Sequence, residues 1–293
     1  MYALTGATGQ LGRLAIASLL RRVAPDTIVA LVRDPAKAAD LEGLGVQVRP
    51  FNYDAPAQLV ASLDGVTRLL FISSDTPETR LAQHEAVIEA ATRVSPELIA
   101  YTSIIHAVTN PISLAESHRE TERMIAASGL PYAILRNSWY IENYLIGADA
   151  AIEHGMLLGS TGNGAISAAT RADYAEAAAA VLTGDVSANR IYELAGDDAF
   201  TLSDVAAVLG EAAGRTIAYR DLPETGYRDA LVGAGLPASF AAALAEYSAK
   251  AAGGILADNT RTLSGLIGRP TEKMRDVLLR ALRRPVGVDG AVR

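Results

Sequence analysis

Short apolar runs alternate with helical patterns through the first half of the chain, and this alternation restricts the fold more than any other feature. After a first strand at Tyr2 to Leu4, buried strands are expected at Ile28 to Val32, Val46 to Val48, Arg68 to Ile72, Leu98 to Thr102 and Pro131 to Leu135. Helical patterns lie between them, at Arg13 to Arg22, Pro35 to Leu44, Ala57 to Leu63, Thr79 to Thr92 and Leu114 to Ser128. Such alternation is typical of a parallel sheet covered on both faces. We therefore predict an α/β fold with a doubly wound parallel sheet, because right-handed crossovers lead to that topology.

A glycine-rich turn follows the first expected strand directly. The stretch LTGATGQLG places Gly6, Gly9 and Gly12 between Leu4 and an alanine- and leucine-rich helical pattern. A strand, a tight turn and a helix in this order bring backbone N–H groups and the positive end of the helix dipole to one point, where a pyrophosphate can bind. The spacing is GxxGxxG and not the standard GxGxxG, and a purely structural turn is the alternative. Its place in the first βαβ unit favours a Rossmann-type dinucleotide site.

The end of the second expected strand indicates which dinucleotide binds. NAD sites place an acidic residue there, about 20 residues past the glycines, whereas a basic residue suits the 2′-phosphate of NADP. Here the strand ends in Arg33, and Lys37 follows one helical turn later. A guanidinium can hold a phosphate through two hydrogen bonds, although Arg33 could instead be a surface residue paired with Asp34. We expect NADPH as the cofactor, without a metal or a flavin.

The pattern changes after Arg136. Irregular, glycine-containing segments are followed by a helix at Arg171 to Leu182, a strand at Ile191 to Leu194 and a mostly helical last third. We predict a dinucleotide-binding domain over residues 1–136, to which residues 165–196 return. Residues 137–164 and 197–286 would form a smaller, mostly helical substrate domain, and residues 287–293 a frayed tail.

Composition excludes several classes of protein. The formal net charge of −7 disfavours a broad electrostatic surface for nucleic acid or an anionic membrane, so we expect neither as a partner. The absence of cysteine excludes disulfides and thiolate metal sites. No uninterrupted apolar run reaches the roughly 18 residues of a membrane span, and no signal peptide is visible. We expect a soluble cytoplasmic protein, with a homodimer as a candidate assembly.

One motif of the common reductases on this fold is missing. Those enzymes use a tyrosine followed four residues later by a lysine, and none of the eleven tyrosines here has that neighbour. At the corresponding helix the chain reads ESHRETERM, where His118 and Glu122 are four residues apart, and we interpret them as an ion pair at a surface or a domain interface. Phosphate-loop, nucleophile-elbow and paired-histidine zinc motifs are also absent.

Several stretches together carry a family resemblance. They are GATGQLG, ALVRDPAKA, FISS, YTSI, LRNSWYIENYL, ATRADYAEAAAAVL and YELAGDDAFTLSDVA. With them the chain closely resembles the NmrA-like atypical short-chain dehydrogenase/reductases. Within that group it is most similar to the bacterial type 2 NAD(P)H:quinone oxidoreductases, with the triphenylmethane dye reductases as near relatives. The resemblance extends to about Arg269, and RNSWYxENY is its most distinctive part.

The resemblance implies the positions of the binding residues. Gly6, Ala7, Thr8, Gly9, Gln10 and Leu11 would surround the pyrophosphate, Arg33 with Lys37 the 2′-phosphate, and Ser73, Ser74 and Asp75 would lie beneath the cofactor. Asn137, Ser138, Trp139, Tyr140, Ile141 and Glu142 would flank the nicotinamide and its ribose, with Tyr140, Asn143 and Tyr144 facing the acceptor. Asn52 stands where relatives usually carry an aspartate that accepts from adenine, and an amide oxygen can accept that bond too.

The chemistry of a quinone fits what is present and what is missing. Quinones and cationic dyes accept a hydride readily, so orientation of the acceptor matters more than a strong general acid. Trp139, Tyr140 and Tyr144 indicate a flat acceptor, although core packing is the alternative for them. Asn143 could hydrogen-bond a quinone oxygen, or cap the short helix that follows. We expect an NADPH-dependent quinone reductase; a cofactor sensor without turnover and a dye reductase are the alternatives.

Overall fold

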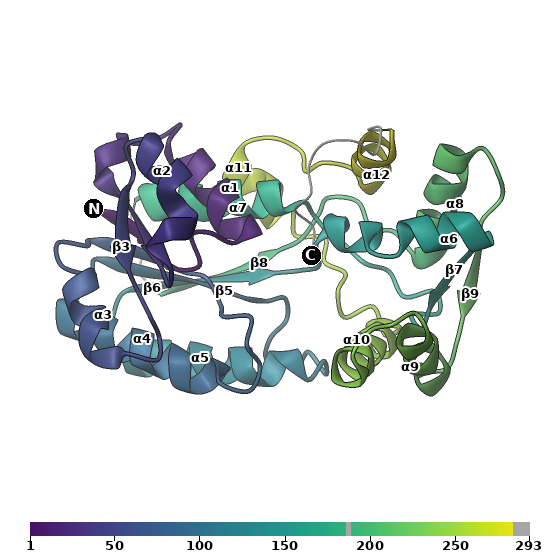
Figure 1. Cartoon of the computed structure of the whole chain (residues 1–293), viewed down its shortest axis with the longest axis horizontal. Helices are drawn as coiled ribbons and strands as arrows, with labels where there is room; N and C mark the ends of the chain where they lie inside the picture. Colours follow the sequence, from purple (N-terminus) through teal and green to yellow (C-terminus); the bar gives the residue numbers. More distant parts are fainter. Residues whose placement is uncertain (186–188, 284–293) are drawn as a thin grey trace.

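A seven-stranded, fully parallel sheet forms the centre of the molecule, and the computed structural model describes residues 1–185 and 189–283 (Figure 1). Its strands lie in the order β3-β2-β1-β4-β5-β6-β8. Their bounds are β1 (Tyr2–Leu4), β2 (Ile28–Val32), β3 (Gln47–Pro50), β4 (Arg68–Phe71), β5 (Leu98–Ile104), β6 (Tyr132–Asn137) and β8 (Arg190–Leu194). This order confirms the doubly wound α/β prediction, and it reverses between β1 and β4, where such sheets bind ligands.

The central strands are apolar because both of their faces are covered. Each residue of β2 and β5 is buried. In β1, Leu4 lies opposite Ala30 of β2 and Leu70 of β4, so the carboxyl ends of the three strands meet at one edge. The glycine-rich turn begins at that edge, directly after Leu4.

Two layers of helices cover the sheet (Figure 1). One contains α1 (Gln10–Leu19), α2 (Ala39–Gly43), α7 (Arg171–Thr183) and α11 (Thr262–Ile267), and the other contains α3 (Pro56–Ser62), α4 (Arg80–Val94) and α5 (Leu114–Ala127). Each layer encloses its own apolar core: Ile16 and Tyr174 belong to the first, Phe71 and Tyr101 to the second. Short 3₁₀ turns, η1 (Pro25–Thr27) and η2 (Pro35–Ala38), complete the first half, and η2 with α2 replaces the single helix expected there.

The chain leaves the sheet after β6 and returns to it with α7 and β8. Between these elements lie η3 (Ile141–Leu145), α6 (Ala148–His154) and β7 (Met156–Gly159). After β8 come α8 (Leu202–Ala213), β9 (Ala218–Asp221), α9 (Glu224–Gly233), α10 (Ala238–Ala251) and, after α11, α12 (Met274–Leu282). These elements enclose a separate core that includes Phe200, Leu209 and Leu278. The domain boundaries themselves stay a prediction, and the frayed tail at 287–293 lies outside the described residues.

A small parallel sheet of β7 and β9 was not expected from the sequence. The two strands pair in register from Met156 with Ala218 to Gly159 with Asp221. Each strand has four residues, most of them partly exposed, so neither shows a buried apolar run. Partners about sixty positions apart leave no local signal of their pairing.

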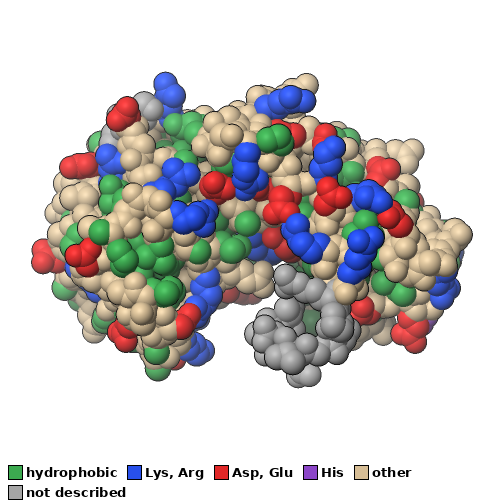
Figure 2. All heavy atoms as spheres, turned by 90° about the horizontal axis from the view of Figure 1, so that it is seen from above, with side chains coloured by type: hydrophobic (Ala, Val, Ile, Leu, Met, Phe, Trp, Pro, Cys, Tyr) green, Lys and Arg blue, Asp and Glu red, His purple; other side chains and the backbone are tan. Residues whose placement is uncertain are grey.

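Charges of both signs share the surface. Figure 2 shows acidic and basic side chains interleaved over the face that looks upward in Figure 1. Ion pairs such as Arg269 with Glu176 (2.6 Å) join neighbouring elements. Within the described residues, no helix combines the length and the apolar character that crossing a membrane requires.

Candidate active site

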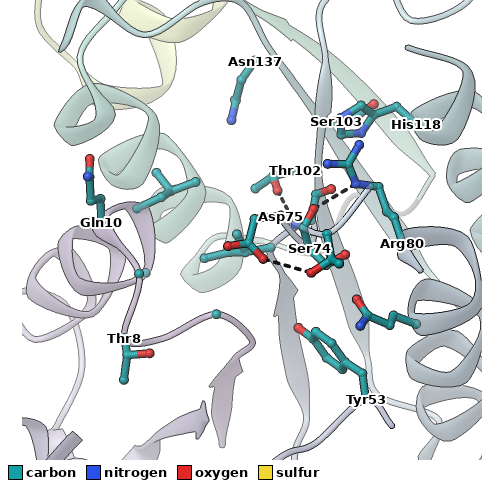
Figure 3. Close-up of a pocket in the computed structure, with 18 of the residues that line it drawn as sticks. Thr8, Gln10, Tyr53, Ser74, Asp75, Arg80, Thr102, Ser103, His118 and Asn137 are labelled. Carbon is teal, nitrogen blue, oxygen red and sulfur yellow. Dashed lines mark hydrogen bonds between the residues drawn. The ribbon is translucent and has the colours of Figure 1, made fainter. Parts of the chain in front are cut away.

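A cavity of about 570 Å³ opens at the carboxyl edge of the sheet (Figure 3). The cavity is lined by residues at or just after the carboxyl ends of β1, β2, β3, β4, β5 and β6, together with side chains of α1, α4, α5 and α7. The sequence-predicted residues in its lining are Gly6, Thr8, Gly9, Gln10, Leu11, Arg33, Asn52, Ser73, Ser74, Asp75, Asn137, Ser138, Trp139, Tyr140 and Asn143. Stretches far apart in the sequence therefore meet around one space.

The glycine turn has the geometry of an anion site. Gly6 adopts a left-handed φ of +60°, which closes the turn. Helix α1 begins after Gly9, and no side chain of residues 1–185 or 189–283 caps its first N–H groups, so they remain available to a ligand. A Cβ at Gly12 would lie 2.2 Å from the backbone oxygen of Gly6, so glycine is needed there for helix and turn to pack. A Cβ at Gly9 would lie 3.2 Å from the same Gly6 oxygen.

Arg33 lies at the end of the cavity that is lined by the segments directly after β2 and β3. The sequence analysis considered Asp34 as an alternative partner for Arg33. The Asp34 side chain instead accepts a hydrogen bond from the Ala36 backbone N–H (3.1 Å). No ion pair among the described residues includes Arg33. Asn52 lines the same end, and its side-chain oxygen accepts from the Asp54 backbone N–H (3.1 Å). A cationic side chain without an acidic partner therefore faces the cavity where a 2′-phosphate was expected.

Asn143 is held by an arginine from α7. Arg171 Nη2 donates to the Asn143 side-chain oxygen (2.9 Å), while the Arg171 backbone N–H donates to Glu142 (2.9 Å). The Arg171 guanidinium also lies 4.3 Å from the centre of the Tyr140 ring. Because a guanidinium only donates, the amide oxygen of Asn143 must face Arg171, and the NH₂ group is left to donate elsewhere. The capping alternative for Asn143 is wrong, since Tyr140 and Gly147 occupy the N-cap positions of η3 and α6.

Aromatic side chains form one wall beside this pair. Trp139 packs edge to face on Tyr247 (ring centres 6.3 Å apart), and Tyr140 does so on Tyr174 (5.5 Å). Both Trp139 and Tyr140 line the cavity. The Asn137 side-chain oxygen is buried without a hydrogen-bond partner among the described residues. A buried acceptor of this kind indicates a place for a ligand donor.

Five of the predicted residues lie outside the cavity lining. The Ala7 and Ile141 side chains are buried in apolar cores. The Lys37 carbonyl accepts from Arg13 (3.0 Å). Glu142 binds Arg171, and Tyr144 packs on Phe200 with ring centres 5.5 Å apart. Their roles toward a cofactor or an acceptor stay predictions.

The sequence reasoning missed several lining residues, including Tyr53, Arg80, Gln83, Thr102, Ser103 and Arg171.

The predicted ion pair of His118 and Glu122 is also wrong, because the two side chains do not pair. His118 Nδ1 shares a 2.8 Å hydrogen bond with the Tyr101 hydroxyl. Glu122 accepts from Ser103 Oγ (2.5 Å) and pairs with Arg136 (2.7 Å). The face of α5 that carries both residues turns inward, so the predicted surface pair is wrong.

Two buried histidines, His84 and the cavity-lining His118, are held neutral. Burial, with the charge of nearby Arg80, lowers the pKa of His84 and of His118 to about 3. His84 Nε2 accepts from the Ser74 backbone N–H (3.0 Å), and its Nδ1 lies 2.8 Å from Thr121 Oγ1. The Thr121 hydroxyl donates to the Ser117 carbonyl, so His84 Nδ1 must be the donor to Thr121. One tautomer of His84 thus fixes the end of β4 against α5.

The described residues contain no group of three or more His, Cys, Asp or Glu side chains arranged to hold a metal ion.

Comparison with known proteins places the similarity over almost the whole chain. Residues 6–185 match the model of a protein family described as NAD(P)H-binding. Quinone oxidoreductase 2 of Escherichia coli (strain K12) is 48% identical over 276 residues, which cover 94% of this chain and 96% of that protein.

Solved structures are also similar to this chain over almost its whole length. The crystal structure of the NADPH-dependent quinone oxidoreductase from Escherichia coli, complexed with NADPH, matches with a TM-score of 0.95 at 46% identity, covering 97% of this chain and 100% of that one. Triphenylmethane reductase of Citrobacter sp., complexed with NADP(H), matches with a TM-score of 0.92 at 33% identity, covering 96% and 100%.

Proposed function

This chain belongs to the NAD(P)H-binding family, and from that premise we propose that it is an oxidoreductase that transfers a hydride from NADPH to a quinone. One observation carries the proposal: a single cavity joins the uncapped glycine turn, Arg33 and the Asn137 to Asn143 stretch at one edge of the sheet. The quinone oxidoreductase of Escherichia coli supports it, because 48% of the residues are identical over 94% of this chain and 96% of that protein.

The residues present fit a nicotinamide dinucleotide. The uncapped N–H groups of α1 would hold its pyrophosphate, and a Cβ at Gly9 would have the Gly6 oxygen, 3.2 Å away, as its nearest neighbour among the described residues. The unpartnered Asn137 oxygen and the Ser73 to Asp75 segment would lie along its nicotinamide half. When bound, NADPH supplies the hydride, and all other steps depend on residues of this chain.

Preference for NADPH over NADH rests on Arg33. The 2′-phosphate is the group by which the two cofactors differ, and a guanidinium that has no acidic partner in the described parts of the chain would bind it through charge-assisted hydrogen bonds. Asp34, the acidic neighbour, turns its carboxylate to the Ala36 backbone and leaves Arg33 free for that contact.

Asn143 would orient the acceptor. Because Arg171 takes up the amide oxygen, the Asn143 NH₂ group can donate to a quinone oxygen and stabilise the negative charge that develops there. Trp139 and Tyr140 would position the flat ring beside it. A quinone gains a delocalised product on reduction, which agrees with the absence of a tyrosine and lysine pair from the sequence.

The test follows the absorbance of NADPH in the presence of the purified chain and 1,4-benzoquinone. We expect oxidation that depends on the quinone, with one NADPH consumed for each quinone reduced. The Gly9→Val variant, which should not bind the cofactor, is the matched negative control. Binding of NADPH without oxidation would instead favour the sensor, and oxidation with a triphenylmethane dye but with no quinone would favour the dye reductase.

A further inference from the structure

Two buried arginines of this fold differ in how their charge is balanced. Arg136, 7% exposed, lies between Glu122 and Glu193, with a nitrogen-to-oxygen distance of 2.7 Å to each. Arg80, 8% exposed, takes part in no ion pair among the described residues. A buried charge without a counter-ion is costly, so an unbalanced one calls for a ligand.

Arg80 is fixed by two neutral groups and keeps free donors. Its Nε donates to the Ser74 carbonyl (2.9 Å) and its Nη1 to Ser117 Oγ (3.1 Å). A guanidinium has five N–H donors, so three remain without a partner among the described residues. Figure 3 shows the Arg80 side chain extending from α4 toward the part of the cavity where Ser103 and His118 lie.

A second group at the same place also lacks a partner. Ser74 is 9% exposed, and its hydroxyl is buried without a hydrogen bond to any described residue. Ser74 and Arg80 both line the cavity. A buried hydroxyl and a buried cation that share one wall suit an anion, which accepts from both.

Arg80 and the glycine turn belong to opposite faces of the sheet. An anion bound by Arg80 would therefore be separate from the phosphates of the cofactor. The glycine turn leads into α1, which covers one face of the sheet, whereas α4 and α5 cover the other (Figure 1). Arg80 comes from the first turn of α4, and its neighbours His118 and Leu114 come from α5. Asp75 lines the cavity too, but its carboxylate is exposed to water, which screens its repulsion of an anion.

The geometry points to Arg80 as the anchor for an anionic substituent on the acceptor, so that the site is built for quinones that carry a carboxylate, a sulfonate or another ionised oxygen. This inference rests on the proposed quinone reductase function and specifies its substrate class. Ser74 would donate a further hydrogen bond to the same group. The flat ring would then extend from Arg80 toward Trp139 and Asn143, which line the same cavity.

A matched pair of probes tests the inference by binding alone. 1,4-Naphthoquinone-2-sulfonate and 2-methyl-1,4-naphthoquinone share the ring and the position of the substituent but differ in charge. Trp139 is the only tryptophan of the chain and lines the cavity, so quenching of its fluorescence reports each Kd without NADPH or turnover. In the wild type we expect the sulfonate to bind more tightly than the neutral quinone.

The variants isolate the charge of Arg80. Arg80→Met should lower the ratio of affinities for the sulfonate over the neutral quinone by about 10- to 100-fold, the value of one charge-assisted hydrogen bond. Arg80→Lys should retain part of the preference, and Arg80→Gln, which keeps neutral donors, should lose it. Arg93→Met is the matched control, because Arg93 is exposed near the other end of α4, and its ratio should equal that of the wild type.

Other outcomes would overturn the inference. If Arg80→Met and Arg80→Gln weaken both quinones equally, Arg80 is a structural link between β4 and α5. If they weaken NADPH binding as much as sulfonate binding, the anion that Arg80 meets belongs to the cofactor. NADPH oxidation by the wild type with 2-methyl-1,4-naphthoquinone is measured in parallel, so that failure of the proposed function is distinguished from failure of the anion subsite.

Discussion

Arg33 is a single side chain on which the choice of cofactor can be tested. Replacing Arg33 with alanine should cost about 10- to 100-fold in NADPH affinity, because charge-assisted bonds to the 2′-phosphate are lost. NADH lacks that phosphate and should bind almost unchanged. Arg33→Asp should reverse the preference, since a carboxylate repels the phosphate and accepts from the ribose hydroxyls. The measurement is the ratio of kcat/KM for NADPH over NADH at one fixed salt concentration.

Lys37 provides the control for Arg33. Its side chain lies outside the cavity lining, so Lys37→Ala should leave the ratio as in the wild type. A ratio that stays constant in both Arg33 variants but changes in Lys37→Ala would transfer the role to Lys37.

Asn143 should act on the acceptor and not on the cofactor. Asn143→Ala removes the NH₂ donor, and we expect kcat with quinone to fall about 10- to 100-fold while the Kd for NADPH changes little. Tyr144→Phe is the neighbouring control, because Tyr144 is not among the residues that line the cavity and phenylalanine keeps its ring contact with Phe200. An equal loss in both variants would mean that the effect is not specific to the Asn143 amide.

Residues announced by a local pattern could be predicted from the sequence, and others could not. Arg33 follows a recognisable strand at a known distance from the glycines, and Asn143 belongs to a distinctive stretch. The pairing of His118 with Tyr101 and the lone charge of Arg80 depend on contacts between β4, β5, α4 and α5. No spacing along the chain indicates such contacts. The sequence therefore predicted an ion pair at a surface or a domain interface where the structure has a buried histidine.

Gly9 and Gly12, in the turn between β1 and α1 and at the start of α1, should differ in what they are needed for: cofactor binding at Gly9 and packing at Gly12. A side chain at Gly9 would occupy the space in front of α1, so Gly9→Val should abolish NADPH binding with little loss of stability. Gly12→Ala should instead destabilise the fold by about 1–3 kcal/mol, because its Cβ would overlap the Gly6 carbonyl. Thermal unfolding and NADPH titration of both variants separate the two effects. Unaltered NADPH affinity in a folded Gly9→Val chain would remove the pyrophosphate from this turn.

Most strands and helices of the sheet could be predicted because each carries its own periodic signal. The expected strand at Ile28 to Val32 is found within the same bounds as β2, and α5 differs from its expected span by one residue. β7 and β9 escaped prediction because pairing between distant, half-exposed segments decides their structure. The elements missed were therefore those that depend on tertiary contacts and have no local sequence signal.

The molecule as a whole should lose stability in mild acid. His84 and His118 have a pKa of about 3 in the folded chain and 6.5 in the unfolded one. Below about pH 6.5 these histidines bind protons in the unfolded chain but not in the native one. The free energy of unfolding therefore falls as the pH falls. Each histidine contributes at most about 1.4 kcal/mol per pH unit. Urea unfolding between pH 7 and pH 5 measures this slope.

His84→Gln isolates one of the two contributions. The amide can accept from Ser74 and donate to Thr121 as the neutral imidazole does, but it does not titrate. We expect a shallower pH dependence in this variant. His154→Gln, at an exposed position of α6, should keep the wild-type slope. A slope for His84→Gln equal to that of the wild type would show that His84 does not resist protonation in the folded chain.

The departure of the chain between β6 and β8 has a consequence for biosynthesis. During translation, β6 emerges with one hydrogen-bonding edge uncovered, and its neighbour β8 follows only after the whole excursion of η3, α6, β7 and α7 has been made. An open, apolar strand edge is a template for association with other chains. A ribosome-bound chain halted before Arg190 should therefore recruit chaperones or aggregate, whereas one halted after the exit of β8 should be protected from both.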